Sequence, residues 1–373
     1  MEILYNSTRS EGAKVKASEA ILKGLSEDGG LFVPESIPAL DKSLEELADM
    51  TYGQVAYEVM KLYLTDFTEE ELKNCIAKAY DEKFDTEEIA PLVSADGAYY
   101  LELFHGATIA FKDMALSILP HLLTTSAKKN NVKNEIVILT ATSGDTGKAA
   151  LAGFADVEGT RIVVFYPKNG VSPIQEKQMV TQKGKNTYVV GIHGNFDDAQ
   201  TGVKKIFGDK ELAEYMNEKG FQFSSANSIN WGRLVPQITY YFSAYADLLA
   251  SGEIESGEEV NFCVPSGNFG NILAGYPTFW RFYPCAEKAG WFHRHLPFPA
   301  THILAKKMIW YISVPRGGCK TSQTYSCDSF LTDLTLVTAN RSSLKSGMIF
   351  ANCFNPYQKT RHNNVPGFLI DPA

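Results

Sequence analysis

The sequence lacks the features that mark membrane proteins, secreted disulfide-rich proteins and zinc proteins. No apolar run in its 373 residues approaches the length that spans a bilayer. The first residues, 1–5, lack the basic and apolar regions of a signal peptide. The six cysteines show no paired spacing, which argues against a disulfide framework and gives no zinc motif. We therefore expect a cytoplasmic protein with no metal site and no membrane partner.

An excess of positive charge is also missing. The formal net charge is −8, so bulk electrostatics gives no reason to expect a nucleic-acid partner. Internal repeats and low-complexity segments are absent as well. The composition, 45% hydrophobic and 21% charged, is that of an ordinary globular chain, and its length suffices for two or three domains.

The first 95 residues are predicted to form an N-terminal module that is mainly helical. Apolar residues recur at helical spacing between residues 43 and 83. Within this range, Thr68-Glu69-Glu70-Glu71 predicts a capping box at the start of the last helix. A shorter helix is predicted over residues 17–25. We interpret this module as scaffold.

Strands and helices alternate from residue 95 onward. The predicted strands are 98–104, 135–140, 161–166, 186–192 and 259–264, and the predicted helices are 110–128, 147–154, 174–182, 195–207, 210–218 and 235–250. Pro120 is expected to kink the helix that contains it. Because the strands are apolar throughout, they predict mostly parallel sheets with helices on both faces, an α/β class with three α/β/α layers.

Two predicted strands end in glycine-rich loops that open a helix. One loop reads Thr-Ser-Gly-Asp-Thr-Gly over residues 142–147, and the other reads Ser-Gly-Asn-Phe-Gly-Asn over residues 266–271. Such a loop binds anions because backbone amides and the helix dipole point at the ligand. Ligands in α/β proteins bind at this edge of the sheet. Neither loop has the spacing of the P-loop or of the dinucleotide fingerprint.

A lysine lies at a third strand end, in Phe111-Lys112-Asp113. Partial burial lowers the pKa of a lysine, which frees its amine to attack a carbonyl. An ordinary first helical turn, with Asp113 facing the helix dipole, is the alternative. The combination of one amine with two anion-binding loops favours a phosphorylated aldehyde cofactor and an anionic amino-acid substrate. Pyridoxal 5'-phosphate meets that description.

Taken together, these motifs resemble those of threonine synthase. The matching stretches are 5–9, 28–34, 104–116, 141–150, 170–182, 227–237 and 264–276. The resemblance implies the tryptophan synthase β-like fold of pyridoxal-phosphate enzymes. It also implies an enzyme, a carbon–oxygen lyase, that converts O-phosphohomoserine and water to L-threonine and phosphate by γ-elimination and β-hydration. This reaction is the last step of threonine biosynthesis.

The resemblance assigns roles by position. It implies that Lys112 is the Schiff-base lysine and the catalytic base. The implied cofactor-binding residues are Lys112, Asp145, Gly267, Asn268, Phe269, Gly270 and Asn271. The implied substrate-binding residues are Ser143, Gly144, Thr146, Asn230 and Arg233. Arg233 is the candidate partner of the substrate phosphate, because a guanidinium fork suits phosphate, and a surface ion pair is the alternative.

Other functions stay open at this point. A fold-related lyase, such as threonine dehydratase or cysteine synthase, would use the same cofactor. A non-catalytic remnant that binds phosphorylated ligands is a third hypothesis. The sequence decides neither between monomer and homodimer nor whether an effector exists.

The chain divides into three predicted parts: an N-terminal module (1–95), a catalytic region (96–276) with a smaller mobile lobe near 135–210, and a tail (277–373). From residue 278 onward there are 11 basic and 4 acidic residues, against 24 and 39 before it, and three of the four tryptophans. We hypothesise that this tail is a frameshifted or mis-joined segment. Strands that complete the sheet and the partner of the cofactor's pyridine nitrogen would then be missing, leaving an unstable, impaired chain.

Overall fold

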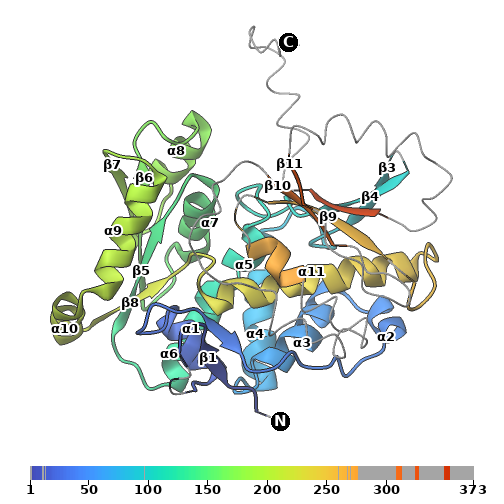
Figure 1. The fold of residues 1–373 in the computed structure, drawn as a ribbon, viewed down its shortest axis with the longest axis horizontal. Coiled ribbons are helices and arrows are strands. Elements are labelled where there is room, and N and C mark those ends of the chain that lie inside the picture. The colour runs from blue at the N-terminus through green and yellow to red at the C-terminus, as the bar shows by residue number, and fades with distance from the viewer. Residues whose placement is uncertain are drawn as a thin grey trace, which may run out of the picture.

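The structure is a computed structural model, and Figure 1 shows its arrangement of helices and sheets. It describes residues 2–10, 12, 14–95, 97–258, 260–266, 268, 270–275, 308–312, 324–326 and 348–352. Within these ranges the strands form a two-stranded, a four-stranded and a six-stranded sheet. We call the four-stranded one the parallel sheet and the six-stranded one the mixed sheet.

The N-terminal module combines a small sheet with four helices. Its elements are β1 (Tyr5–Ser7), α1 (Ala17–Lys23), β2 (Phe32–Pro34), α2 (Leu44–Ala48), α3 (Tyr52–Tyr63) and α4 (Glu69–Ala79). The antiparallel pair β1–β2 did not follow from the sequence. The predicted capping box of α4 is confirmed, since Thr68 N–H donates to Glu71 Oε2 (2.8 Å) and Glu71 N–H donates to Thr68 Oγ1 (3.2 Å).

Helices cover both faces of the parallel sheet, whose strand order is β7-β6-β5-β8. Its strands are β5 (Glu135–Ala141), β6 (Thr160–Pro167), β7 (Thr187–Ile192) and β8 (Phe221–Ser225), and its helices are α7 (Asp145–Phe154), α8 (Pro173–Val180), α9 (Phe196–Gly208) and α10 (Lys210–Glu218). Successive side chains of β5 point to opposite faces. Ile136 and Ile138 join the main core, while Val137 and Leu139 pack with Ala199 of α9. The three-layer expectation is thus confirmed for this sheet.

The mixed sheet has the order β11-β10-β9-β12-β4-β3. Its strands are β3 (Leu92–Ala95), β4 (Ala98–Glu102), β9 (Asn261–Ser266), β10 (Met308–Ile312), β11 (Thr324–Ser326) and β12 (Met348–Asn352). β12 runs parallel to both β4 and β9, and the other pairings are antiparallel. Because β10, β11 and β12 follow residue 277, the expectation that the tail adds no strand to the sheet is wrong. The remainder of the tail lies outside the described residues.

The helix predicted over residues 110–128 is in fact two helices, α5 (Asp113–Leu116) and α6 (Leu119–Lys129). Pro120 lies in the first turn of α6, where its missing N–H costs no helical hydrogen bond. Two short strands were missed. β8 carries Gln and Ser among its five residues and so looked polar, while β3 pairs antiparallel with β4 with Ala95 opposite Ala98, and Gly97 has φ 76°.

The long helix α11 (Trp231–Ala250) runs beneath the mixed sheet and contacts α2, α3 and α5 (Figure 1). It begins four residues before its predicted start, because Asn230 caps its N-terminus by accepting from Gly232 N–H at 2.9 Å. Most of its side chains are buried in a core that is continuous from Ile3 to Ala274. The helix therefore joins the N-terminal module to the catalytic region.

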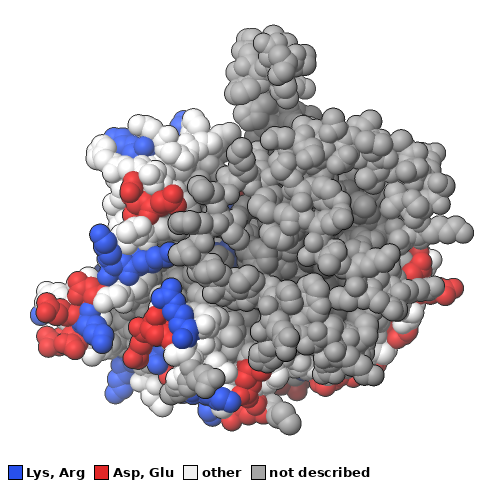
Figure 2. Space-filling model, in the orientation of Figure 1, with Lys and Arg blue, Asp and Glu red and all other residues white. Residues whose placement is uncertain are grey.

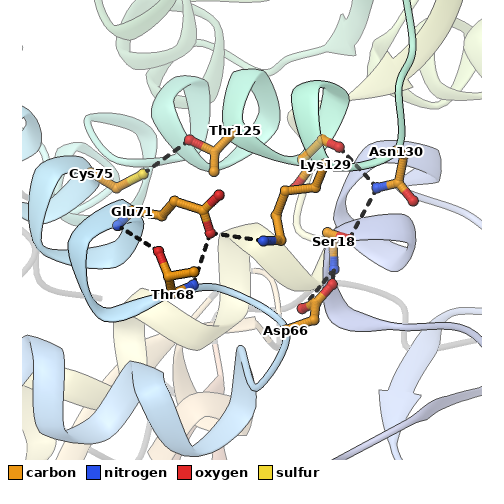
Figure 3. A network of polar contacts seen from close by, with 9 residues as sticks. Ser18, Asp66, Thr68, Glu71, Cys75, Thr125, Lys129 and Asn130 are labelled. Atoms are coloured by element: carbon orange, nitrogen blue, oxygen red, sulfur yellow. Dashed lines mark hydrogen bonds and ion pairs between the residues drawn. The ribbon is translucent and has the colours of Figure 1, made fainter.

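Polar contacts fasten α1, α4 and α6 to one another, as Figure 3 shows. Lys129 Nζ lies 2.8 Å from Glu71 Oε2, and Asn130 Nδ2 donates to Ser18 Oγ at 3.0 Å. The Ser18 N–H in turn donates to the Asp66 carboxylate. These partly buried contacts fix the helix α6 that follows α5 against the N-terminal module.

None of the described helices combines the length and the apolar character that crossing a bilayer requires. On the part of the surface that Figure 2 colours, acidic and basic side chains are interspersed around α8, α9 and α10. Opposite charges placed in this way neutralise each other's long-range field.

Candidate active site

A cavity brings together the ends of several elements. Its lining residues are Phe111, Lys112, Thr146, Asn227, Ser228, Arg233, Gln237, Asn268, Gly270 and Asn271. They come from the start of α5, the first turn of α7, the loop between β8 and α11, the first two turns of α11 and the residues after β9. Of the twelve residues predicted for the site, ten are described, and six of these ten line this cavity: Lys112, Thr146, Arg233, Asn268, Gly270 and Asn271. The strand ends therefore converge as the parallel topology required.

Lys112 follows a loop whose conformation is fixed by hydrogen bonds to Asp113. The buried Asp113 carboxylate accepts from Thr108 N–H at 2.8 Å and from Thr108 Oγ1 at 2.7 Å. Between them, Ile109 has φ 59°, a left-handed conformation that a β-branched residue rarely adopts. Burial raises the pKa of Asp113, and the hydrogen bonds from Thr108 oppose that rise. The loop thus stores strain beside the half-buried Lys112.

The loop before α7 is shaped by Thr142, which sequence reasoning missed. Its Oγ1 accepts from Gly144 N–H at 2.9 Å and from Gly147 N–H at 2.8 Å. Gly144 has φ 133°, and a Cβ there would lie 2.4 Å from the Gln175 side chain. Two backbone N–H groups at the start of α7 are therefore bonded to Thr142, which orients the loop that carries the exposed Ser143.

Asp145 connects this loop electrostatically to Lys112. Burial raises the pKa of Asp145, but the charges of Lys112 and Lys148 and a hydrogen bond from Gln175 outweigh burial and lower the pKa overall. Lys148 is 5% exposed, and its Nζ lies 3.2 Å from Asp145 Oδ1. Gln175 Nε2 donates to the same oxygen at 2.8 Å. An ionised carboxylate therefore stands near the lysine amine, held by a buried cation.

Arg233 is a buried guanidinium at the cavity. It is 3% exposed, and Nη1 donates to the Ala226 carbonyl at 2.7 Å. Its Nε has no hydrogen-bond partner among the described residues, and no ion pair of Arg233 is present among them. Burial lowers the pKa of Arg233 to about 10, which still leaves it charged at neutral pH. The alternative of a surface ion pair is therefore excluded for the part of the chain described.

The loop after β9 supplies the polar groups of the opposite wall. Asn271 is 4% exposed, and its Nδ2 has no hydrogen-bond partner among the residues described. Gly270 approaches Ser228 so closely that an added Cβ would lie 3.1 Å from the serine Cβ. Asn268 is exposed at the cavity, whereas Gly267 and Phe269 lie outside the described residues.

Two other residues have structural tasks. Asn230 is fully buried, and its Nδ2 donates to the carbonyls of Ile21 (3.0 Å) and Ser225 (2.9 Å). Its side chain is thus committed to the backbone and to capping α11, away from the cavity lining. His105 contacts Asp85 and Glu102 through its two ring nitrogens, so both are occupied by carboxylates.

A larger, open cavity lies between α3, α4 and residues 81–89. Its two lysines are already paired, Lys61 with Glu58 and Lys73 with Glu69, both at 2.6 Å. It is lined by no residue of the strand ends that meet at Lys112. Among the described residues, no cluster of His, Cys, Asp or Glu is suited to hold a metal ion. The smaller cavity is therefore the candidate site.

Comparison with known proteins gives the geometry a context. Residues 4–80 match the family described as "Threonine synthase N terminus". Threonine synthase of Schizosaccharomyces pombe is 40% identical over 285 residues, covering 74% of this chain and 54% of that protein. Threonine synthase-like 1 of Pongo abelii is 42% identical over 268 residues, covering 69% of this chain and 36% of that protein.

Solved structures agree with the sequence relatives. The threonine synthase from Brucella melitensis, described as bound to PLP, superimposes with a TM-score of 0.65 at 36% identity, covering 74% of this chain and 57% of that one. Yeast threonine synthase gives a TM-score of 0.66, also at 36% identity, covering 74% of this chain and 56% of that one. The chain spans about half the length of the threonine synthases it matches.

Proposed function

We propose that this chain, a relative of the threonine synthases, converts O-phosphohomoserine and water to L-threonine and phosphate with pyridoxal 5'-phosphate. The observation that carries the proposal is the convergence of Lys112 with two buried donors, Arg233 Nε and Asn271 Nδ2, which have no partner among the described residues, at one cavity. A buried donor without a partner is costly, and an anion in the cavity would satisfy it.

The residues present fit the cofactor. An amine is needed to bond its aldehyde, and Lys112 supplies one. Its phosphate needs backbone and amide donors, which Asn268, Gly270 and Asn271 provide at the start of the helical residues 270–275. When bound, the cofactor supplies an electron sink for charge that develops on the substrate. We propose Lys112, Asp145, Asn268, Gly270 and Asn271 as its ligands.

The chain's own residues would bind, orient and transfer protons. Arg233 would hold the substrate phosphate, since its guanidinium is charged, buried and desolvated. Ser143, Gly144 and Thr146 would contact the substrate carboxylate. Lys112 Nζ would take the proton from the substrate Cα and later move a proton at Cβ, and the negative charge of Asp145 would stabilise the protonated amine between these steps.

The direct test is product analysis with O-phosphohomoserine. Wild type is expected to release L-threonine and inorganic phosphate in equal amounts, slowly if residues 277–373 impair the chain as hypothesised above, and Lys112→Ala is expected to release neither. Lys183→Ala, which changes an exposed lysine, serves as the control and should match wild type. Another product, such as a 2-oxo acid, would assign the chain to a different lyase. No turnover by a cofactor-loaded wild type would contradict the proposal.

The remaining proposals concern setting and organisation. We propose a cytoplasmic enzyme without nucleic-acid or membrane partners. We also retain the division into residues 1–95, 96–276 and 277–373, with a mobile lobe around 135–210. The second hydrophobic core, between β5 and α9, supports a lobe with some independence.

A further inference from the structure

Below the cavity, α11 presents one polar face to the loop after β9. Gln237 follows Arg233 by four residues, and Tyr240 and Tyr241 follow Gln237 by three and four, so they lie on the same side of the helix. The two tyrosines are fully buried. In an otherwise apolar core each phenol needs a partner, and both find it in Asn271.

The Asn271 side-chain oxygen receives both phenols. Tyr240 O–H donates to Asn271 Oδ1, and Tyr241 O–H donates to the same oxygen at 2.9 Å. Each phenol has a second acceptor farther away, the Asn271 carbonyl at 3.1 Å from Tyr241 and Gln237 Oε1 at 3.3 Å from Tyr240. The shorter contacts direct Oδ1 of Asn271 toward the two phenols, so Nδ2 is directed away from them.

The orientation of this amide decides whether Asn271 offers a hydrogen-bond donor or an acceptor to the cavity. With Nδ2 outward, Asn271 presents a donor to an anion. With the amide reversed, it would present a carbonyl oxygen and repel the anion. Gln237 supports the first arrangement, because its Nε2 donates to the Arg233 carbonyl at 2.6 Å and so keeps its Oε1 toward Tyr240.

We propose that Tyr240 and Tyr241 are positioning residues that orient the Asn271 amide so that its NH₂ faces a phosphate in the cavity. This inference rests on the proposed function, because it takes the phosphate to be that of pyridoxal 5'-phosphate. Neither tyrosine lines the cavity, so each would act through Asn271. The hydrogen-bond donor that Asn271 offers to the cavity then depends on two O–H groups of α11.

The test compares pyridoxal 5'-phosphate with pyridoxal on the full-length chain. The two ligands differ only in the phosphate ester. The dissociation constant of pyridoxal divided by that of pyridoxal 5'-phosphate therefore measures the contribution of the phosphate. Tyr240→Phe and Tyr241→Phe should each lower this ratio about tenfold, the weight of roughly one hydrogen bond to a charged group, with pyridoxal affinity unchanged. Asn271→Asp keeps acceptors for both phenols but presents a carboxylate oxygen, so it should lower the ratio further.

Tyr245→Phe is the matched control. Tyr245 is buried on the same helix, and its O–H donates to the Glu258 carbonyl at 3.1 Å, away from Asn271. Its ratio should equal that of wild type. If Tyr240→Phe and Tyr241→Phe keep the wild-type ratio, the inference is overturned and the proposed function stays intact. The same holds if the ratio falls equally in Tyr245→Phe. A wild type that binds both ligands equally, or neither, overturns both.

Discussion

At the scale of single residues, the site depends on buried charges that are held in place by short polar contacts. Asp113 anchors the loop before Lys112, and Asp145 is held by Lys148 and Gln175. Asp113 and Asp145 lie in motifs that the sequence shows, but their contacts with Thr108, Lys148 and Gln175 do not follow from those motifs. They set the position and the charge environment of Lys112, and each can be removed separately.

Asp113→Ala should destabilise the chain by about 2 to 3 kcal/mol, because it leaves the buried Thr108 N–H and hydroxyl without their acceptor. Asp113→Asn should cost about 1 kcal/mol, since one oxygen remains and the buried charge is gone. Chemical unfolding of the two variants checks the order. Equal losses would show that the carboxylate does not hold the loop.

The ionisation of Asp145 predicts a pH dependence. Because its folded pKa lies below the ordinary value of 3.8, its contribution to stability is present above that value and is lost as pH falls through the folded pKa. The stability advantage of wild type over Asp145→Asn should therefore shrink from pH 6 to pH 3. Unfolding midpoints at several pH values measure it, and a difference that is constant with pH would contradict the assignment.

At the scale of elements, close backbone contacts join the parallel sheet to the helix after Lys112. Gly153 of α7 faces the last residue of α5, where an added Cβ would lie 2.2 Å from the Leu116 carbonyl oxygen. That oxygen is backbone and cannot rotate away. The contact fixes how α7, and the loop that opens it, stands relative to Lys112.

Gly153→Ala should therefore destabilise the chain by about 2 to 3 kcal/mol through overpacking. Gly202→Ala is the matched control, because Gly202 lies in α9 with no atom within 4 Å of an added Cβ. It should stabilise by about 0.5 to 1 kcal/mol through helix propensity. Calorimetric or chemical unfolding compares them, and a neutral Gly153→Ala would show that α7 can shift without cost.

The sequence predicted these elements well where hydrophobic period and loop chemistry agreed. The strands β5, β6 and β7 and the helix α10 were predicted because the pattern of apolar residues that forms them lies within each segment itself. The roles of four residues were not predicted, because their partners lie elsewhere in the chain or in a neighbouring turn. These residues are Thr142, Lys148, Tyr240 and Tyr241. Asn230 was assigned to the substrate because residues 227–237 resemble a family segment, although its side chain caps α11 and donates to two backbone carbonyls.

At the scale of the whole molecule, one hydrophobic core runs from Ile3 to Ala274 and includes α3 and α11. The boundary drawn near residue 95 therefore separates two parts of the sequence but crosses a shared core. A second, smaller core is centred on β5 and α9, with residues of β6, β7, β8 and α10 packed against it. These two cores define the expected units of unfolding.

Hydrogen exchange should show that the amides of α3 and α11 open together, with one common free energy, because they share that core. Amides of α9 should exchange through a smaller opening. Separate protection of α3 and α11 would show that the N-terminal module unfolds by itself.

For residues 277–373, we still propose a frameshifted or mis-joined segment on the basis of its change in charge and tryptophan content. The strands β10, β11 and β12 complete the mixed sheet without altering that composition argument. Translation of the other two frames of the gene tests it. A family-like continuation in another frame is the expected result, and its absence from both frames would contradict the proposal.

The most direct test of the account is to find which amine takes the cofactor. The full chain is incubated with pyridoxal 5'-phosphate, reduced with borohydride, digested and examined by mass spectrometry. We expect the pyridoxyl-phosphate mass on the peptide that contains Lys112, and we expect this mass to be absent in Lys112→Ala. A label on Lys148, or one spread over surface lysines with Lys112 unmodified, would contradict it.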